Sequence, residues 1–356
     1  MGVDSVQSRN QRLFAKKLDL KRGAVDLTHG AGGRASAQLF EEVFKPAFSN
    51  PMLNAGDDQA RFAGHGRMVM ATDSHVVSPI VFPGGDIGAL AIHGTVNDVA
   101  MAGAVPKYIT AGFILEEGFA LSTVKQITQS MADAAQEAGV EVIAGDTKVV
   151  ERGKGDGVFI NTTGVGFIPE SLRNPPAANR AKPGDKILVS GSMGDHGITI
   201  LSERESLPLM APLTSDTAAL HGLVAQLIAA VPDVHVLRDP TRGGLATAIN
   251  EICRSSGCGA ELEESAIPIK RTVDAACELL GVDPLYLANE GKLIAIVDGS
   301  DAETALAALK AHPLGQDAAI IGTVTDDFNG FVQMKTPLGG RRMVDWLTGD
   351  PLPRIC

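Results

Sequence analysis

The sequence has 356 residues, of which 44% are hydrophobic and 21% are charged, and this is the composition of a folded chain long enough for two domains. Its formal net charge of -11, with no basic run, argues against nucleic acid or an anionic membrane as a partner. The N-terminal stretch is polar and no long apolar run occurs, so we expect no signal peptide, no membrane span and a cytoplasmic protein.

The first half of the chain contains β-branched, apolar runs and segments of helical period. They predict strands at 67–77, 108–115, 140–144 and 158–168, and helices at 87–101 and 121–138. The Pro-rich segment 169–183 follows and predicts a linker, because prolines interrupt both helices and strands.

The second half repeats the mixture of strands and helices in a different order. Its pattern predicts strands at 186–189, 259–263, 293–297, 319–324 and 331–334, and helices near 214–229, 244–255 and 303–311. Neither half has the regular βα alternation of a simple parallel sheet, so we expect an α+β protein with mixed sheets and helices on one face. The expected domains are 1–168 and 184–335, joined by the linker and followed by a mobile tail, 336–356.

The four cysteines are too few for a disulfide framework in a chain of this size. Cys253 and Cys258 lack a second ligand pair and are expected to be structural, and Cys277 lies in an apolar helical pattern. Cys356, the last residue, follows two prolines that favour an extended chain. It is either an accidental residue of a frayed end or a nucleophile on a swinging tail, and an exposed thiol that serves no purpose is a liability.

Aspartates stand beside glycine or at strand ends throughout the first half, at Asp57, Asp58, Asp73, Asp98 and Asp146. Each alone is best explained as a turn residue. Together, such carboxylates could converge on one rim of a sheet and hold Mg²⁺ against a nucleoside triphosphate.

A Gly-rich loop at 28–34 could wrap phosphate with its backbone N–H groups, and Lys148 could meet phosphoryl charge. The Walker pattern G-x-x-x-x-G-K-[ST] is absent from the sequence. The chain is therefore predicted to be an ATP enzyme without a P-loop.

Two segments of the second half, 191–197 and 238–244, lead from a strand toward a helix and could leave helix N–H groups facing a ligand. Ordinary strand-to-helix turns explain them equally well. Glu290 precedes an apolar strand and is a candidate general base, although a solvated loop glutamate fits the sequence as well.

These motifs, in this order, resemble the HypE family of hydrogenase maturation proteins, carbamoyl dehydratases of the aminoimidazole ribonucleotide synthetase-like superfamily. The resemblance covers essentially the whole chain. It runs through THGAGG at His29, GDD at Asp58, ND at Asp98, GDTK at Lys148, RDPTRGG at Asp239, NEGK at Glu290 and the ending PRIC. The middle motifs belong in part to the superfamily, and the PRIC ending singles out the family.

The resemblance implies a two-domain fold, a homodimer joined through the N-terminal sheets, and ATP and Mg²⁺ bound near that interface. It implies that a HypF-like carbamoyltransferase loads Cys356, that the S-carboxamide becomes a thiocyanate, and that a HypC–HypD-like iron scaffold receives the cyanide for [NiFe] hydrogenase. It assigns catalysis to Cys356, Lys148 and Glu290, and metal binding to Asp58, Asp73, Asp98 and Asp146. The nucleotide-binding set is His29, Gly30, Gly32, Gly33, Asp58, Asp98, Gly145, Asp146, Thr147 and Lys148.

Two alternatives remain at this stage. A small-molecule kinase or a selenophosphate synthetase would share the superfamily motifs, but the latter favours a reactive cysteine in the N-terminal region, and no cysteine precedes Cys253. A non-enzymatic thiol carrier would use Cys356 without consuming ATP.

Overall fold

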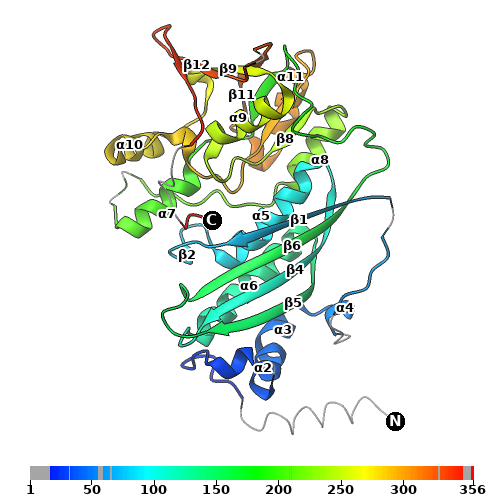
Figure 1. Ribbon diagram of the computed structural model, residues 1–356, viewed down its shortest axis with the longest axis vertical. Coiled ribbons are helices and arrows are strands. Elements are labelled where there is room, and N and C mark those ends of the chain that lie inside the picture. Colours follow the sequence, from blue (N-terminus) through cyan, green and yellow to red (C-terminus); the bar gives the residue numbers. More distant parts are fainter. Residues whose placement is uncertain are drawn as a thin grey trace.

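The computed structural model describes residues 17–31, 33–54, 59–64, 66–207, 209, 211–327, 329–347 and 354–356. It has two layered halves, and the last residues of the chain lie between them (Figure 1). Gly32, Asp57, Asp58, Pro351 and Pro353 lie outside the described residues. No helix among the described residues is long and apolar enough to cross a membrane.

The N-terminal half is built on a four-stranded sheet of order β1-β6-β4-β5. Its strands are β1 (Arg67–His75), β6 (Val158–Ile168), β4 (Val105–Glu116) and β5 (Glu141–Val150). The β4–β5 pair is parallel and the other two pairs are antiparallel, as expected for a mixed sheet. One face is covered by α5 (Ile87–Met101) and α6 (Leu121–Ala138), and α5 begins where the Asp86 carboxylate accepts hydrogen bonds from the backbone N–H groups of Gly88 and Ala89.

The opposite face of this sheet carries side chains that alternate with those packed on α5 and α6. Met68 and Met70 on β1 and Ile114 on β4 belong to it, with 52%, 74% and 44% of their surfaces exposed. Such an apolar, solvent-facing sheet surface is typical of a surface that associates with another protein.

A group of short helices before β1 was not predicted. It comprises η1 (Leu27–Gly30), α2 (Arg34–Leu39), the π-helical turn η2 (Phe40–Phe44), α3 (Lys45–Phe48) and α4 (Pro51–Asn54). Gly30 packs so closely on β5 that an added Cβ would lie 2.4 Å from the backbone nitrogen of Val149. A glycine is therefore required where the 28–34 loop crosses the strand. The two short strands β2 (Val81–Phe82) and β3 (Gly85–Asp86) pair with each other before α5.

The C-terminal half is a seven-stranded sheet of order β13-β12-β9-β11-β7-β10-β8. The strands are β7 (Lys186–Val189), β8 (Val236–Arg238), β9 (Gly259–Glu263), β10 (Ile294–Val297), β11 (Ala319–Thr325), β12 (Val332–Lys335) and β13 (Arg341–Met343). The helices are α7 (Asp195–Glu205), α8 (His221–Ala230), α9 (Gly244–Ser256), α10 (Arg271–Leu280) and α11 (Ala302–Lys310), with short η3 (Glu264–Ala266), η4 (Pro284–Tyr286) and η5 (Pro313–Gly315).

Both faces of this second sheet are covered, so the expectation of helices on one face is wrong for this half. Ile187 and Val189 of β7 pack with α9, whereas Leu188 packs with α8 and α11. A strand that is buried on both faces has a continuous run of apolar residues in its sequence. Such a run does not show that both faces of the sheet are covered by helices.

Two further boundaries differ from the sequence predictions. The predicted helix at 214–229 begins only at His221, because residues 214–220 form an extended loop over the cleft between the domains. The tail does not begin at 336, since β13 pairs with β12 and Val344 is buried in the C-terminal core. Residues 169–185, by contrast, contain no helix or strand.

The three cysteines that were expected to be structural, Cys253, Cys258 and Cys277, are buried.

Candidate functional site

A large cavity lies where the two halves meet. It has a volume of about 790 Å³ and is lined by charged residues from both of them. β1 and α5 contribute Asp73 and Asp98, and the loop before α9 contributes Asp239 and Arg242. Cys356 also lines this cavity, and the C-terminus of the chain lies between the two halves (Figure 1).

Two side chains hold Glu290 beside this cavity through hydrogen bonds to the main-chain atoms of Glu290. Its N–H donates to Asp216 Oδ1 at 3.1 Å, and its carbonyl accepts from Asn97 Nδ2 at 3.1 Å. The next residue must be glycine, because a Cβ on Gly291 would lie 1.7 Å from the carbonyl oxygen of Asp216. Lys292 Nζ pairs with the other Asp216 oxygen at 3.1 Å, so the NEGK segment is fixed from three sides.

The side chain of Glu290 is buried, with 5% of the residue exposed, and its Oε1 has no hydrogen-bond partner. Burial, and then the negative charges of Asp216, Asp239, Asp73 and Asp98, raise its pKa well above the usual range. A carboxyl group in this state is poised to exchange a proton rather than to remain a fixed anion. Glu290 is therefore not a solvated loop residue.

The thiol of Cys356 lies near the Glu290 carboxyl group, which is one of the groups that raise the thiol pKa. Burial raises the pKa of Cys356 well above its usual range, and the charges of Glu290 and Asp73 act in the same direction. Arg242 opposes this shift. The docked sulfur is therefore a neutral thiol, and it lies against the group predicted to act as base.

The three predicted metal ligands that the structure describes, Asp73, Asp98 and Asp146, are not assembled within one chain. Asp73 and Asp98 share the cleft, but Asp146 lies on β5, and β1 and β5 are opposite edges of the sheet, separated by three strand intervals or about 14 Å. Among the described residues no group of three or more His, Cys, Asp or Glu side chains is arranged to hold a metal ion. Asp58 lies outside the described part of the chain.

The pKa of Asp98 shows the effect of the concentrated negative charge in the cleft. Burial, followed by the charges of Asp239 and Asp73, raises its pKa to about 7, against the effect of Arg238 and Arg242. Such mutual repulsion is what a bound divalent cation would relieve.

Asp98→Asn is therefore expected to stabilise the protein in the absence of Mg²⁺ while weakening its response to Mg²⁺-ATP. Because the native pKa of Asp98 is raised, the parent protein loses stability as pH rises from the unfolded pKa toward 7, whereas the variant does not. The free energy of unfolding of the variant should therefore exceed that of the parent by on the order of 1 kcal/mol or more at pH 8 and by almost nothing near pH 4. Thermal unfolding with EDTA at both pH values, and with Mg²⁺-ATP, measures the two effects. An equal gain at pH 4 and pH 8 would contradict this electrostatic account.

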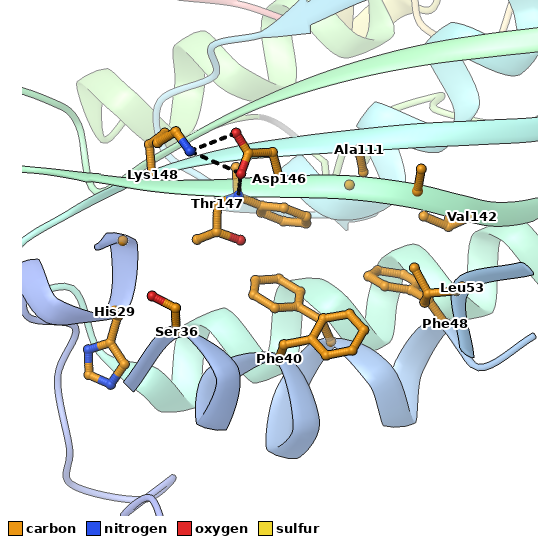
Figure 2. A pocket seen from close by; sticks show the side chains of 15 residues that line it. His29, Ser36, Phe40, Phe48, Leu53, Ala111, Val142, Asp146, Thr147 and Lys148 are labelled. Atoms are coloured by element: carbon orange, nitrogen blue, oxygen red, sulfur yellow. Dashed lines mark hydrogen bonds and ion pairs between the residues drawn. The ribbon is translucent and has the colours of Figure 1, made fainter. Parts of the chain in front are cut away.

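A second cavity, of about 230 Å³, lies between β5 and the short N-terminal helices (Figure 2). It is lined mainly by apolar side chains, with Phe40, Phe44 and Phe48 on the helical side. The structure brings six of the predicted nucleotide residues to it, which are His29, Gly30, Gly145, Asp146, Thr147 and Lys148. The cavity is smaller than the roughly 300–1,000 Å³ of typical small-molecule sites, so it could hold only part of a nucleotide.

Strand alternation divides the GDTK residues between two faces. Thr147 points toward His29, Ser36 and Phe40, whereas Asp146 and Lys148 lie on the open side of β5 (Figure 2). Lys148 Nζ is 2.9 Å from Asp146 Oδ2, and both side chains are mostly exposed. Lys148 is therefore positioned to meet a ligand on the open sheet face and is not adjacent to Glu290 within one chain.

His29 has a structural task. Its Nδ1 accepts a hydrogen bond from the backbone N–H of Asp26 at 3.0 Å, and the Asp26 side chain caps the same 3₁₀ turn.

The two strand-to-helix segments of the second half differ in what they face. In the 191–197 segment the Gly194 N–H donates to Asn289 Oδ1, so this turn is used in packing. The 238–244 segment, by contrast, faces the cleft through Asp239 and Arg242.

The sequence did not single out Asp216, Arg242, His196 or Arg204. Arg242 stands in the RDPTRGG motif and could have been chosen from it. Asp216 was assigned to a helix, and His196 and Arg204 act on residues more than 100 positions away in the sequence. Only the three-dimensional structure brings them to the cleft.

Two family models match the chain. They are the AIR synthase related protein, N-terminal domain, at residues 56–168, and the AIR synthase related protein, C-terminal domain, at residues 182–335. The paired domains and the cleft between them thus define an AIR synthase related protein.

Individual relatives narrow this class. The "Carbamoyl dehydratase HypE" of Cupriavidus necator is 61% identical over 345 residues, which cover 96% of this chain and 98% of that protein. A crystal structure of hydrogenase maturation protein HypE in complex with ATP matches with a TM-score of 0.89 and 51% identity, covering 93% of this chain and 99% of that chain. A crystal structure of a HypE-HypF complex matches with a TM-score of 0.76 and 48% identity, covering 87% of this chain and 99% of that chain. The chain belongs to the HypE family of carbamoyl dehydratases, which confirms the resemblance and the two-domain α+β fold.

Proposed function

We propose that this chain is a carbamoyl dehydratase that converts an S-carboxamide on Cys356 into a thiocyanate at the expense of ATP. The observation that carries the proposal is the docked thiol, which lies beside the buried carboxyl group of Glu290 in the cleft between the domains. The HypE relatives, one of them a complex with ATP, support the same activity.

The chemistry explains why ATP is needed. In R–S–C(=O)–NH₂ the oxygen is a poor leaving group. Transfer of the γ-phosphoryl group to this oxygen gives R–S–C(=NH₂⁺)–OPO₃²⁻ and ADP. Loss of one N–H proton to the protein and cleavage of the C–O bond then give R–S–C≡N, and the phosphate leaves with the other proton as HPO₄²⁻. The protein must remove the first proton and stabilise the phosphoryl charge.

Glu290 is proposed as the base. Its carboxyl group lies near the sulfur and is therefore proposed to face the amide nitrogen of a carbamoylated Cys356. Its raised pKa makes it a stronger base when ionised than an exposed glutamate. The neighbouring carboxylates open onto the cleft, where a proton can pass to water.

ATP is proposed to bind across the open sheet face and the apolar cavity, with Lys148 meeting its phosphoryl charge. Mg²⁺ would neutralise that charge when bound, and the carboxylates proposed to hold it are Asp73 and Asp98 in the cleft together with Asp146 and Asp58. Burial and the charges of Asp239 and Asp73 raise the pKa of Asp98, so the cleft has the concentrated negative charge that a divalent cation would bind.

The open face of the N-terminal sheet supports a homodimer. Exposed Met68, Met70 and Ile114 would be covered by the same face of a second copy. Since Lys148 and Asp146 lie on this face, the second copy would also enclose the phosphoryl end of the site. The separation of Lys148 from Glu290 within one chain is then bridged by the assembly.

The proposed partners follow from the two ends of the reaction. A HypF-like carbamoyltransferase would load the thiol, as the HypE-HypF complex among the structural relatives suggests, and a HypC–HypD-like iron scaffold would accept the cyanide for [NiFe] hydrogenase. We place this exchange in the cytoplasm, where a reducing environment keeps Cys356 as a free thiol.

Lys148→Ala is expected to slow ATP cleavage and water loss together, by roughly 100-fold, because one cation that stabilises the transferring phosphoryl group is lost. Single-turnover measurements starting from tail already carbamoylated on Cys356 separate the two steps. Lys154→Ala, which removes an exposed lysine from the turn after β5, serves as the control. Normal ATP cleavage in Lys148→Ala would remove this residue from the mechanism.

The decisive test of the function is intact-protein mass spectrometry of Cys356 after incubation with a carbamoyl donor system, with and without ATP. We expect a carbamoyl adduct that loses one water only when ATP is hydrolysed. An adduct that keeps its mass while ATP is consumed would rule out the dehydratase.

A further inference from the structure

The last three residues are held on the N-terminal domain by backbone hydrogen bonds. Ile355 forms an antiparallel bridge with Val77, just after β1. The N–H of Val76 donates to the carbonyl oxygen of Cys356 at 2.9 Å, and the N–H of Ser78 donates to that of Arg354 at 3.2 Å. The segment thus adds a short strand to the edge of the domain, a common mode of peptide recognition.

The C-terminal domain holds two of these residues, Arg354 and Ile355, from the other side through α7. His196 Nε2 lies 2.7 Å from the carbonyl oxygen of Ile355, and Arg204 Nη2 donates to the carbonyl oxygen of Arg354 at 2.7 Å. Arg204 also donates from Nε and Nη2 to the carbonyl oxygen of Ser78. Its guanidinium therefore links the tail to the segment Val76–Ser78, with which the tail pairs.

The bonds around His196 fix its tautomer. The ring is fully buried, and burial lowers its pKa, so the imidazole is neutral. A carbonyl oxygen only accepts, which puts the proton on Nε2 and leaves Nδ1 to accept from Ser215 Oγ at 2.7 Å. The Ser215 oxygen in turn accepts from the N–H of Thr217 at 3.1 Å. Every polar atom of this relay has a partner once the tail is docked, and Nε2 would lose its partner if the tail left.

The side chains of the tail are recognised as well. The Arg354 guanidinium pairs with Asp156 on the turn between β5 and β6, and Ile355 is 6% exposed within the N-terminal core. Three consecutive residues therefore have three different contacts, and the sulfur of the third is delivered to Glu290.

We infer that His196 and Arg204 are positioning residues that clamp the Arg354–Cys356 backbone and so place the Cys356 sulfur against Glu290 for dehydration. This inference rests on the proposed function for its purpose, but the clamp itself is independent of any reaction. Because α7 belongs to one domain and the Val76–Ser78 edge to the other, the clamp exists only while the two domains face each other across the cleft.

The clamp has opposite consequences for the two halves of the proposed cycle. Docking brings the carbamoylated sulfur to Glu290, which favours dehydration. It also keeps the free thiol partly covered beside a carboxyl group, which disfavours attack on an external carbamoyl donor. Weakening the clamp should therefore increase the reactivity of the free thiol and slow the dehydration of the loaded tail.

The test uses the full-length protein and iodoacetamide at pH 7.5. The other three cysteines are buried, so Cys356 is expected to react first, and intact-mass analysis gives its rate. Arg204→Gln should raise this rate at least about fivefold, since it removes several hydrogen bonds, and Arg204→Lys should raise it less. Arg341→Gln, which breaks a surface pair with Glu261 far from the tail, is the matched control and should leave the rate unchanged.

A second pair of variants examines the buried relay. His196→Leu removes the donor to Ile355 and should raise the alkylation rate, whereas His196→Gln retains an amide donor and should restore much of the protection. Arg204 is only half-buried, so it remains informative if His196→Leu folds poorly. Alkylation rates equal to the parent in both Arg204→Gln and His196→Leu, with folding confirmed by circular dichroism, would overturn the clamp.

Alkylation needs neither ATP nor a carbamoyl donor, so failure of the clamp and failure of the proposed function are distinguishable. A protected thiol that is released by Arg204→Gln supports the clamp even if no thiocyanate ever forms. If both hold, pre-carbamoylated Arg204→Gln should lose water at least about fivefold more slowly in a single turnover, with its ATP affinity unchanged.

Discussion

Cys356→Ala is expected to abolish formation of both the carbamoyl adduct and the thiocyanate, because no other thiol lies in the cleft between the domains. ATP binding should be retained, since the cavity beside β5 does not include this residue. The fold should also be retained, because the variant keeps Ile355 in the N-terminal core and keeps the backbone bond from Val76. Loss of the sulfur contacts is expected to cost on the order of 1 kcal/mol.

The measurement is intact-protein mass spectrometry with the carbamoyl donor system, alongside thermal unfolding with and without ATP. Cys277→Ala is the matched control, because it removes a buried thiol from α10 without touching the cleft. The control should carry the same modification as the parent. Thiocyanate on Cys356→Ala protein would mean that another group accepts the carbamoyl unit and would end the proposed mechanism.

Sequence reasoning identified Glu290 and Cys356 because each stands in a local motif. The expected reaction required these residues to meet, but their local sequences could not show how, since they are far apart in the chain and only the docked tail joins them. Sequence reasoning also left open whether Glu290 was solvated. The answer depends on Asn97 and Asp216, which bond to the Glu290 backbone from two other parts of the structure.

The predicted rim of aspartates was separated for a topological reason. Asp73 and Asp146 both lie in strands, but the order of strands in a sheet is not encoded in their local sequences. The strands that carry them became the two edges, β1 and β5. The sheet therefore keeps Asp73 and Asp146 apart within one chain.

The loop that contains Asp216 was mistaken for the start of a helix because apolar residues recur near it at helical spacing. Its side chain instead bonds to the N–H of Glu290 and to Lys292, and Ser215 bonds to His196. These long-range bonds to the loop outweigh its weak local preference for a helix. Functional loops of this kind are where local sequence reasoning is least informative.

Glu290→Gln is expected to slow water loss by roughly 10²–10⁴-fold, because the amide cannot take the proton from the carbamoyl nitrogen. ATP cleavage should fall less, and ATP binding should be preserved, since Gln keeps the shape of the side chain and the backbone bonds to Asp216 and Asn97 do not depend on it. Comparison with Lys148→Ala, which should impair both steps together, distinguishes a base from a residue that stabilises phosphoryl charge.

The same substitution is expected to make the protein more stable at neutral pH. The native pKa of Glu290 is raised, so the folded state keeps a proton that the unfolded chain releases above pH about 4.3. Between that pH and the native pKa the parent loses up to about 1.4 kcal/mol of stability per pH unit through this one group, whereas the variant has no such loss. The advantage of Glu290→Gln should therefore be near zero at pH 4 and should grow as pH rises.

Chemical denaturation of both proteins at pH 4, 6 and 8 tests this expectation, with Glu170→Gln as the same substitution at an exposed position of the linker. A variant that is less active and more stable would show that Glu290 is kept buried and unpaired for its chemistry, at a cost to the fold. A variant less stable than the parent at pH 8 would mean that Glu290 is ionised and paired in the native cleft. Its Oε1 would then have a partner, and the base would have to be sought among Asp73, Asp98 and Asp239, the carboxylates that line the cleft together with Cys356.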